Sequence, residues 1–231
     1  MQAAMTGKAK TEKYSVPYWL RLRRSMLRGF FRQVFHALFH IEINGLENIP
    51  KGKAYIISHN HVSLFEPPLI AAFWPEHIEA IAGADVFHRP GQKFFVRAYR
   101  AIPIRRGEYD RKVIDVMMNV LGSGRPLMIA PEGGRSHETA LRRAQAGVAY
   151  IVDRAKVPVL PVGISGTTDD ALSRALRGGR PHLRMNIGDA FSPPAIEGRG
   201  DVRRESRQRN ADLVMEQIAA LIPEEYRGVY R

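Results

Sequence analysis

The chain has 231 residues, 45% of them hydrophobic, and this length suffices for one domain with a sizeable core. It contains no cysteine, which excludes a disulfide framework, a thiolate zinc site and a cysteine nucleophile. The formal net charge of +12 favours polyanionic partners, and composition alone does not choose among nucleic acid, anionic lipid headgroups and phosphorylated substrates.

The first predicted element is an arginine-rich amphipathic helix within residues 17–41, or two short helices broken near Gly29. One stripe of this helix is apolar and the arginines lie elsewhere, which is typical of a helix that rests in the interface of an anionic leaflet. Arginines interrupt every apolar run, so the segment is too charged to span a bilayer. A basic helix packed on its own domain is the alternative interpretation. The apolar stripe consists of Trp19, Leu22, Met26, Phe30, Val34 and Leu38.

We therefore treat residues 1–41 as a basic N-terminal arm that binds a membrane surface. Its aromatic side chains would enter the interface, and its arginines would meet anionic headgroups. The protein is accordingly expected to be a peripheral, monotopic membrane protein on the cytoplasmic face. The residues expected to contact the membrane are Trp19, Arg24, Arg28, Phe30 and Phe31.

Residues 42–231 are expected to form a single α/β domain. Apolar runs alternate there with helical patterns, which predicts a mixed, largely parallel sheet flanked by helices. The predicted strands lie near residues 54–58, 78–83, 101–104, 127–130, 157–164 and 183–187. The clearest predicted helices are 69–74, 110–121, 140–156, 169–176 and 202–221.

A histidine and a carboxylate follow the first of these strands, in the sequence Asn60-His61-Val62-Ser63-Leu64-Phe65-Glu66-Pro67. The strand delivers His61 to a sheet edge, while Pro67 and Pro68 preset the first turn of a helix and push Glu66 out of the α region. The two side chains therefore straddle a turn. In that context the carboxylate can accept the Nδ1 proton and leave Nε2 to take a proton from a hydroxyl.

Three further clusters lie near ends of predicted strands, where an open α/β sheet usually binds its ligands. Arg105 and Arg106 precede a glycine turn, and guanidinium forks suit phosphate oxygens. Residues 131–136 combine two glycines with Glu132 and Arg135. Residues 157–164 are an apolar run punctuated by prolines. Solvated arginines, a plain glycine turn and a core strand are the alternative interpretations of the three clusters.

Taken in order, these blocks resemble the glycerophospholipid acyltransferase superfamily, whose best-known members are the lysophosphatidic acid acyltransferases. The resemblance spans about residues 45–164, and it rests on the joint occurrence of the blocks in this order. The first block normally ends in aspartate, where this chain has Glu66. Gly134 replaces a usual threonine, and Arg100 and Pro103 replace a usual glycine and phenylalanine. The matching blocks are residues 60–66, 104–106, 131–136 and 159–162.

The resemblance implies transfer of a fatty acyl group from acyl-CoA or acyl carrier protein to the free hydroxyl of a lysophospholipid. The foremost expected acceptor is 1-acyl-glycerol-3-phosphate, which would give phosphatidic acid. His61 would be the general base and Glu66 would orient it. The resemblance implies no metal and no cofactor besides the acyl-donor substrate. The residues expected to bind the acceptor are Arg106, Glu132, Gly133, Gly134 and Arg135.

Other functions remain open at this stage. A family member with a different acceptor would keep the same blocks. A noncatalytic membrane-surface protein would use the basic arm and tolerate the replacement of aspartate by Glu66. A nucleic-acid binder would explain the net charge, but the chain has no zinc-ligand spacing and no RNA-binding signature, so no nucleic-acid partner is expected.

Overall fold

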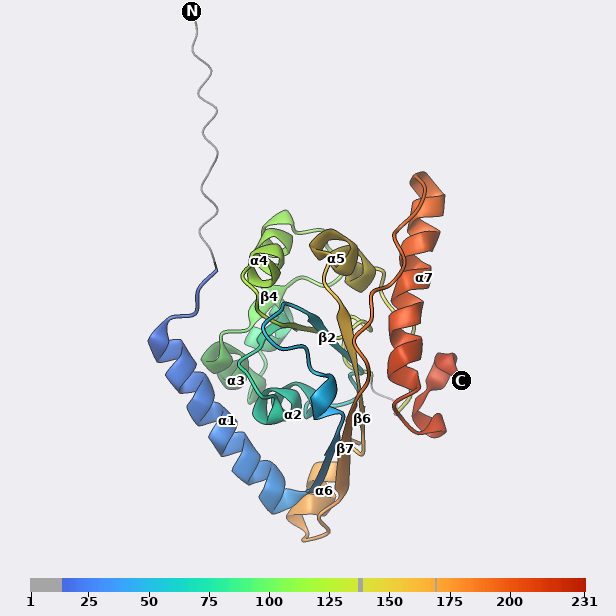
Figure 1. The fold of residues 1–231 in the computed structure, drawn as a ribbon. Helices are drawn as coiled ribbons and strands as arrows, with labels where there is room; N and C mark the ends of the chain where they lie inside the picture. Colours follow the sequence, from blue (N-terminus) through green and yellow to red (C-terminus); the bar gives the residue numbers. More distant parts are fainter. Residues whose placement is uncertain (1–13, 137–138, 169) are drawn as a thin grey trace, which may run out of the picture.

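The computed structural model describes residues 14–136, 139–168 and 170–231, and it contains a seven-stranded sheet flanked by helices (Figure 1). The first 13 residues of the predicted arm and Asp169, the expected start of a helix, lie outside the described residues. In chain order the strands are β1 (His40–Asn44), β2 (Ile56–His59), β3 (Glu79–Gly83), β4 (Ile102–Ile104), β5 (Leu127–Ile129), β6 (Val159–Ser165) and β7 (His182–Ile187).

The strands lie in the order β1-β7-β6-β2-β5-β3-β4. Strands β2 to β6 run parallel to one another, β7 is antiparallel to β6, and β1 is parallel to β7. The predicted fold class, a mixed and largely parallel sheet with flanking helices, is confirmed. Strands β2, β5 and β6 are buried along their whole length, which accounts for the near-continuous apolar runs that predicted them.

Helices cover both faces of the sheet. They are α1 (Tyr18–Leu38), α2 (Glu66–Phe73), α3 (Gln92–Tyr99), α4 (Arg111–Gly122), α5 (Gly147–Ala155), α6 (Ala171–Leu176) and α7 (Gly200–Ala219). One hydrophobic core joins the sheet to α4, α5 and α7, and a second joins it to α1, α2 and α6. Neighbouring residues of β2 serve different cores, Ile56 the first and Ile57 the second, because successive side chains of a strand point to opposite faces. Figure 1 shows α1, α2 and α3 on one side of the sheet and α7 on the other.

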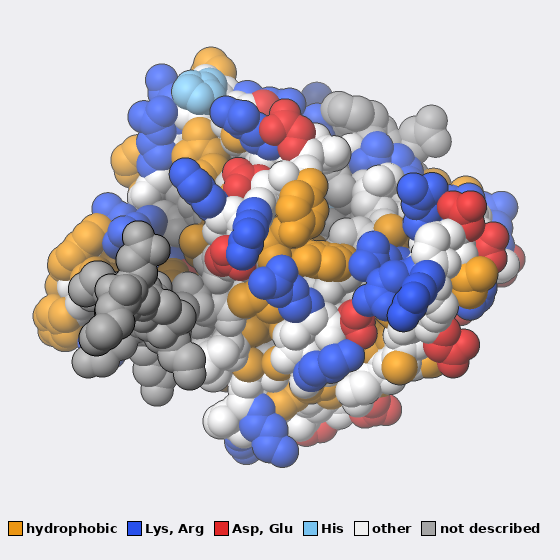
Figure 2. All heavy atoms as spheres, turned by 90° about the horizontal axis from the view of Figure 1, so that it is seen from above, with side chains coloured by type: hydrophobic (Ala, Val, Ile, Leu, Met, Phe, Trp, Pro, Cys, Tyr) orange, Lys and Arg blue, Asp and Glu red, His pale blue; other side chains and the backbone are white. Residues whose placement is uncertain are grey.

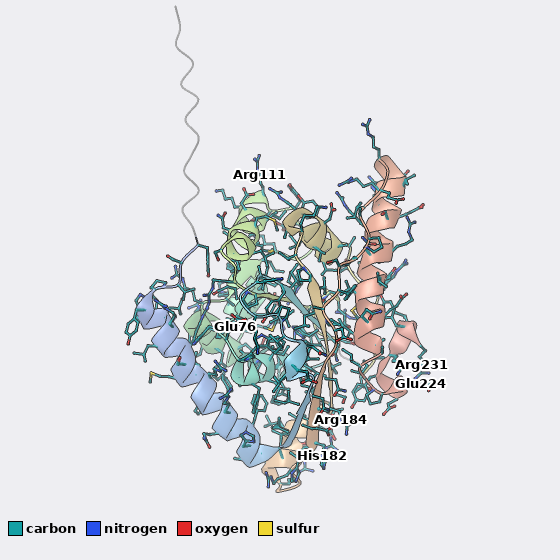
Figure 3. All side chains as sticks on the ribbon, viewed as in Figure 1. Glu76, Arg111, His182, Arg184, Glu224 and Arg231 are labelled. Carbon is teal, nitrogen blue, oxygen red and sulfur yellow. The ribbon has the colours of Figure 1, made fainter. Side chains whose placement is uncertain are left out.

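Strand β1 and helix α3 were not predicted. Helix α1 ends at Leu38 and β1 begins at His40, so the expected boundary after residue 41 falls inside a strand. Strand β1 pairs with β7, and at the first residues of the two strands the rings of His40 and His182 stack with centroids 4.9 Å apart. Two positions along, Arg184 forms an ion pair with Glu42 at 2.9 Å, and both β7 side chains lie at the same end of the molecule (Figure 3).

Candidate active site

Several polar side chains follow directly after the parallel strands, at the carboxyl edge of the sheet. His61 comes two residues after β2, Arg106 two after β4, Glu132 three after β5 and Thr167 two after β6. Because the carboxyl ends of parallel strands meet at one edge, residues far apart in the chain are brought together here. The structure thus builds the site from segments that span more than 100 residues.

His61 and Glu66 form a pair. The Nδ1 atom of His61 lies 3.1 Å from Oε2 of Glu66, and the histidine side chain is 17% exposed whereas the carboxylate is fully buried. An ionised carboxylate can only accept, so Nδ1 carries the proton and Nε2 is left as a potential base. The pair therefore has the arrangement that general-base catalysis requires.

The backbone of Glu66 differs from the expectation. Helix α2 begins at Glu66 itself, so the residue is not pushed out of the helical region by the prolines that follow. The missing amide protons of Pro67 and Pro68 cost nothing there, because amides of a first helical turn have no partner within the helix. The amide of Ser63 closes the turn by donating to both carboxylate oxygens of Glu66, at 2.9 and 3.0 Å.

Two hydroxyl groups complete the surroundings of Glu66. Ser63 Oγ and Thr167 Oγ1 both donate to Oε1, at 3.1 and 2.5 Å, and both residues are buried. Burial by itself raises the pKa of the Glu66 carboxyl, but the bonds from His61, Thr167 and the Ser63 amide outweigh burial and hold the pKa below its ordinary value. The carboxylate is therefore charged and able to stabilise an imidazolium. The sequence alone gave Ser63 and Thr167 no role.

Glu132 is held by backbone amides. Its Oε1 accepts from the amide of His61 at 2.8 Å, and its Oε2 accepts from the amide of Arg142 at 3.0 Å. The amide of Ser136 donates in turn to the carbonyl of His61 at 2.7 Å. Burial raises the pKa of the Glu132 carboxyl in spite of these bonds. The turn after β5 thus fixes the backbone that carries His61, a connection that the sequence did not reveal.

Arg106 lies against the glycines of the site. Its guanidinium is 39% exposed and forms an ion pair with Asp85 at 3.0 Å. A Cβ atom added to Gly83 would come within 2.5 Å of that guanidinium, and one added to Gly134 would lie 3.6 Å from Arg106 Nε. Gly133 has a φ of 71°, which a side chain disfavours. In this turn Glu132 therefore contacts His61 and Gly134 lies beside Arg106, while Arg135 continues the same turn.

The expected membrane-contact residues fall into two groups. Trp19 and Phe30 are more than half exposed, on one side of α1, and Phe31 is partly buried with its ring 5.2 Å from that of Phe95 in α3. Arg24 and Arg28 instead point into the domain, and the expectation for Arg24 was wrong because its side chain is fully buried against Glu79. Arg28 donates to the carbonyls of Ala72 and Trp74.

The outer side of α1 keeps the apolar stripe that the sequence predicted over its first three turns. Tyr18, Trp19, Leu22, Met26 and Phe30 are exposed there, while Leu20 and Phe35 pack against the domain. Figure 2 shows hydrophobic side chains next to lysine or arginine side chains on the side of the molecule where α1 lies. Within the described part of the chain, no helix is long and apolar enough to cross a membrane. In that same part, histidines, aspartates and glutamates form no group of three or more that could hold a metal ion.

Comparisons with known proteins match this architecture. The acyltransferase family model matches residues 40–165. A lyso-ornithine lipid O-acyltransferase of Pseudomonas aeruginosa is 26% identical over 205 residues, which cover 81% of this chain and 77% of that protein. The 1-acyl-sn-glycerophosphate acyltransferase PlsC of Thermotoga maritima has a similar fold, with a TM-score of 0.59 and 23% identity over 84% of this chain and 78% of that one. The resemblance drawn from the four sequence blocks is thereby confirmed.

Proposed function

Because the chain belongs to the acyltransferase family, we propose that it moves a fatty acyl group from a thioester donor to the free hydroxyl of a lysolipid, with His61 as the general base. The observation that carries the proposal is the bond between His61 Nδ1 and the buried Glu66 carboxylate at the carboxyl edge of the sheet. The foremost candidate acceptor is 1-acyl-glycerol-3-phosphate. A lyso-ornithine lipid is the second candidate, since the curated relative is named for it.

The proposed reaction needs no covalent enzyme intermediate. Nε2 of His61 takes the proton of the acceptor hydroxyl while the oxygen attacks the thioester carbonyl. The carbon–sulfur bond then breaks, the new ester forms, and the imidazolium returns its proton to the thiolate. Glu66 holds the ring in the required tautomer and stabilises the imidazolium meanwhile. A general base contributes a factor of about 10² to 10⁴, so the remaining acceleration comes from positioning and from stabilisation of the oxyanion.

The proposed acceptor site consists of the turn after β5 and the arginine after β4. Arg106 and Arg135 would supply guanidinium groups for phosphate oxygens, and Gly133 and Gly134 would let a ligand approach the backbone closely. The contact between Arg106 and the Gly134 position supports this grouping. Glu132 was expected to bind substrate as well, and its bonds to the amides of His61 and Arg142 favour a role in fixing the base.

The proposed location is the cytoplasmic face of a membrane, with the outer side of α1 in the interface. The exposed aromatic side chains Trp19 and Phe30 support it, and Phe94 of α3, which is 65% exposed, extends the same surface through Phe95 and Phe31. Vesicle flotation with anionic lipid tests this: Trp19→Ser together with Phe30→Ser should release the protein, and Val229→Ser, at an exposed apolar residue near the C-terminus, is the control. Undiminished flotation of the double variant would count against the surface.

The decisive test of function is mass spectrometry of the products formed from a panel of lysolipids and acyl thioesters. We expect wild-type protein to acylate at least one acceptor, with acyl-CoA and acyl carrier protein compared as donors. His61→Ala should lose about 10²-fold to 10⁴-fold in rate while its fold is retained. His182→Ala, at an exposed histidine of β7, is the matched control. Unchanged acyl transfer by His61→Ala would refute the assignment, and a wild-type protein that only binds vesicles would favour the noncatalytic alternative.

A further inference from the structure

Glu66 stands where the family's first block usually has aspartate, so its carboxylate lies one methylene further from the backbone. At that distance Oε1 accepts a hydrogen bond of 2.5 Å from Thr167 Oγ1. Both side chains are fully buried, and the two residues are 101 positions apart in the chain. Thr167 lies beyond the residues that the family model matches, which end at Ser165. The bond therefore joins the dyad to a segment outside the four sequence blocks.

The backbone around Thr167 leaves it little freedom. Gly166 has a φ of 87°, and a Cβ atom at this position would lie 2.0 Å from the carbonyl oxygen of His182, so the turn requires glycine. The amide of Gly166 donates to the hydroxyl of Tyr226 at 3.2 Å. Strand β6, buried along its length, ends directly before this turn. These contacts fix the position from which Thr167 reaches Glu66.

The two oxygens of Glu66 have different sets of partners. Oε1 accepts from both hydroxyls, Ser63 Oγ and Thr167 Oγ1, whereas Oε2 faces Nδ1 of His61. The Ser63 amide donates to both oxygens and so does not distinguish them. Ser63 is only three residues away on the same turn and moves with it. Among the residues that the structure describes, only Thr167 ties Oε1 to a distant part of the sheet, and so it fixes the rotation of the carboxylate that directs Oε2 toward the histidine.

We propose that Thr167 is a positioning residue of the acyl transfer, which anchors Oε1 of Glu66 so that Oε2 meets Nδ1 of His61. This inference rests on the proposed function. Thr167 touches no substrate; it acts through Glu66 and then through His61. It lets a glutamate take the place of the shorter aspartate, because the added methylene brings the carboxylate within reach of the threonine hydroxyl.

The test compares kcat and KM of Thr167→Val, which keeps the shape of threonine but not its hydroxyl. Loss of a hydrogen bond to a buried charge should lower kcat about 10-fold to 100-fold, with KM changed less than about 3-fold. Thr167→Ser, which retains the hydroxyl, should keep at least about half of kcat. An unchanged kcat in Thr167→Val, or an equal loss in Thr167→Ser, would overturn the inference. If Thr167→Val does not fold, the smaller Ser and Ala variants provide the same contrast.

A second experiment tests whether the effect of Thr167 depends on the longer side chain of glutamate at position 66. In Glu66→Asp the shorter carboxylate falls short of the hydroxyl, so adding Thr167→Val should cost less than about 2-fold in kcat. The same loss in both backgrounds would assign Thr167 to packing alone. Nitrogen NMR of the His61 ring adds a readout independent of turnover: a single Nδ1–H tautomer in wild type and a mixture in Thr167→Val. An identical tautomer ratio would contradict the inference.

His61→Ala is measured in parallel to separate the two proposals. If His61→Ala is inactive and Thr167→Val is fully active, only the positioning role fails. If His61→Ala remains active, the proposed function of the dyad fails and the role of Thr167 fails with it. Wild-type protein without acyl transfer to any lysolipid would overturn both.

Discussion

Two buried glutamates of this molecule, Glu66 and Glu79, have side chains that are both fully shielded from solvent, yet their partners differ in kind. Glu66 accepts from one amide, two hydroxyls and one histidine. Glu79 accepts from two arginines: Arg24 meets both oxygens at 2.7 Å, and Arg125 reaches Oε1 at 2.9 Å. In each case burial by itself raises the carboxyl pKa, but the donors lower it by more, so both groups have a pKa below the ordinary value.

The difference between the partners indicates a difference in use. A guanidinium is permanently charged, so the cluster around Glu79 keeps a fixed charge at every working pH and acts as an anchor. It joins α1 through Arg24 to β3 through Glu79, and Tyr14 adds a hydroxyl at 2.9 Å. The histidine beside Glu66 changes its charge during the proposed reaction. Damage to the Glu79 cluster should therefore cost stability, whereas damage to the Glu66 cluster should cost rate.

The largest expected effect on stability is that of Glu79→Gln. The substitution leaves Arg24 buried without a counter-charge, and breaking a buried ion pair in this way costs about 3–5 kcal/mol. Urea unfolding should show this loss, while kcat per folded molecule stays close to wild type. Glu42→Gln, at an exposed ion pair on β1, is the control and should unfold like wild type. A Glu79→Gln protein of full stability and low kcat would reverse the comparison.

A smaller effect should arise on the dyad side as the pH falls. His59 is buried with its ring 5.8 Å from that of His61, and burial lowers its pKa from 6.5 to about 4. Between these values the unfolded chain binds a proton that the folded protein does not, so stability falls as the pH falls, by roughly 2–3 kcal/mol at pH 4.5. His59→Asn should remove this slope in urea unfolding between pH 6.5 and 4.5.

The carboxylates of Glu66 and Glu79 contribute to stability in a lower pH window. Their pKa values are lowered from 4.5, so the stability that they provide is complete well above pH 4.5 and is lost as the pH falls below it through the folded-state pKa. Glu79→Gln should therefore flatten the curve of stability against pH only below about pH 5.

For the histidine, an unaltered slope of stability between pH 6.5 and 4.5 in His59→Asn would contradict the assignment of that slope to the buried imidazole.

Local patterns in the sequence were sufficient to predict features that lie within one short segment of the chain. The buried strands β2, β5 and β6 are short apolar runs, and the pair of His61 and Glu66 lies within six residues of one turn. Strand β1 gave no such signal, because it alternates exposed and half-buried residues and depends on β7, which lies more than 130 residues away. Edge strands of this kind are defined by their partner and not by their own sequence.

The roles of single charged residues were the hardest to predict. Five arginines lie on α1 and nothing in its periodicity distinguishes Arg24, whose carboxylate partner is 55 residues away in β3. Glu132 was expected to bind the acceptor, and its bond to the His61 amide was not predicted, since hydrogen bonds to backbone leave no trace in a sequence. Thr167 was missed because its partner is a side chain 101 positions away in the chain. Helix α1 packs on its own domain on one side, as the alternative interpretation expected, and exposes aromatic residues on the other, where the membrane surface stays a proposal.

The smallest effect, expected for Arg24→Lys, separates these two sides of α1. An ammonium keeps the charge but cannot meet both oxygens of Glu79 and the carbonyl of Tyr99, which Arg24 Nε contacts at 2.9 Å. Losing part of this geometry should lower the unfolding free energy by about 1–2 kcal/mol, less than in Glu79→Gln. Flotation on anionic vesicles should stay at the wild-type level, because Arg24 faces the domain and the exposed aromatic residues are intact. A lysine variant of full stability that floats less than wild type would assign Arg24 to the membrane surface after all.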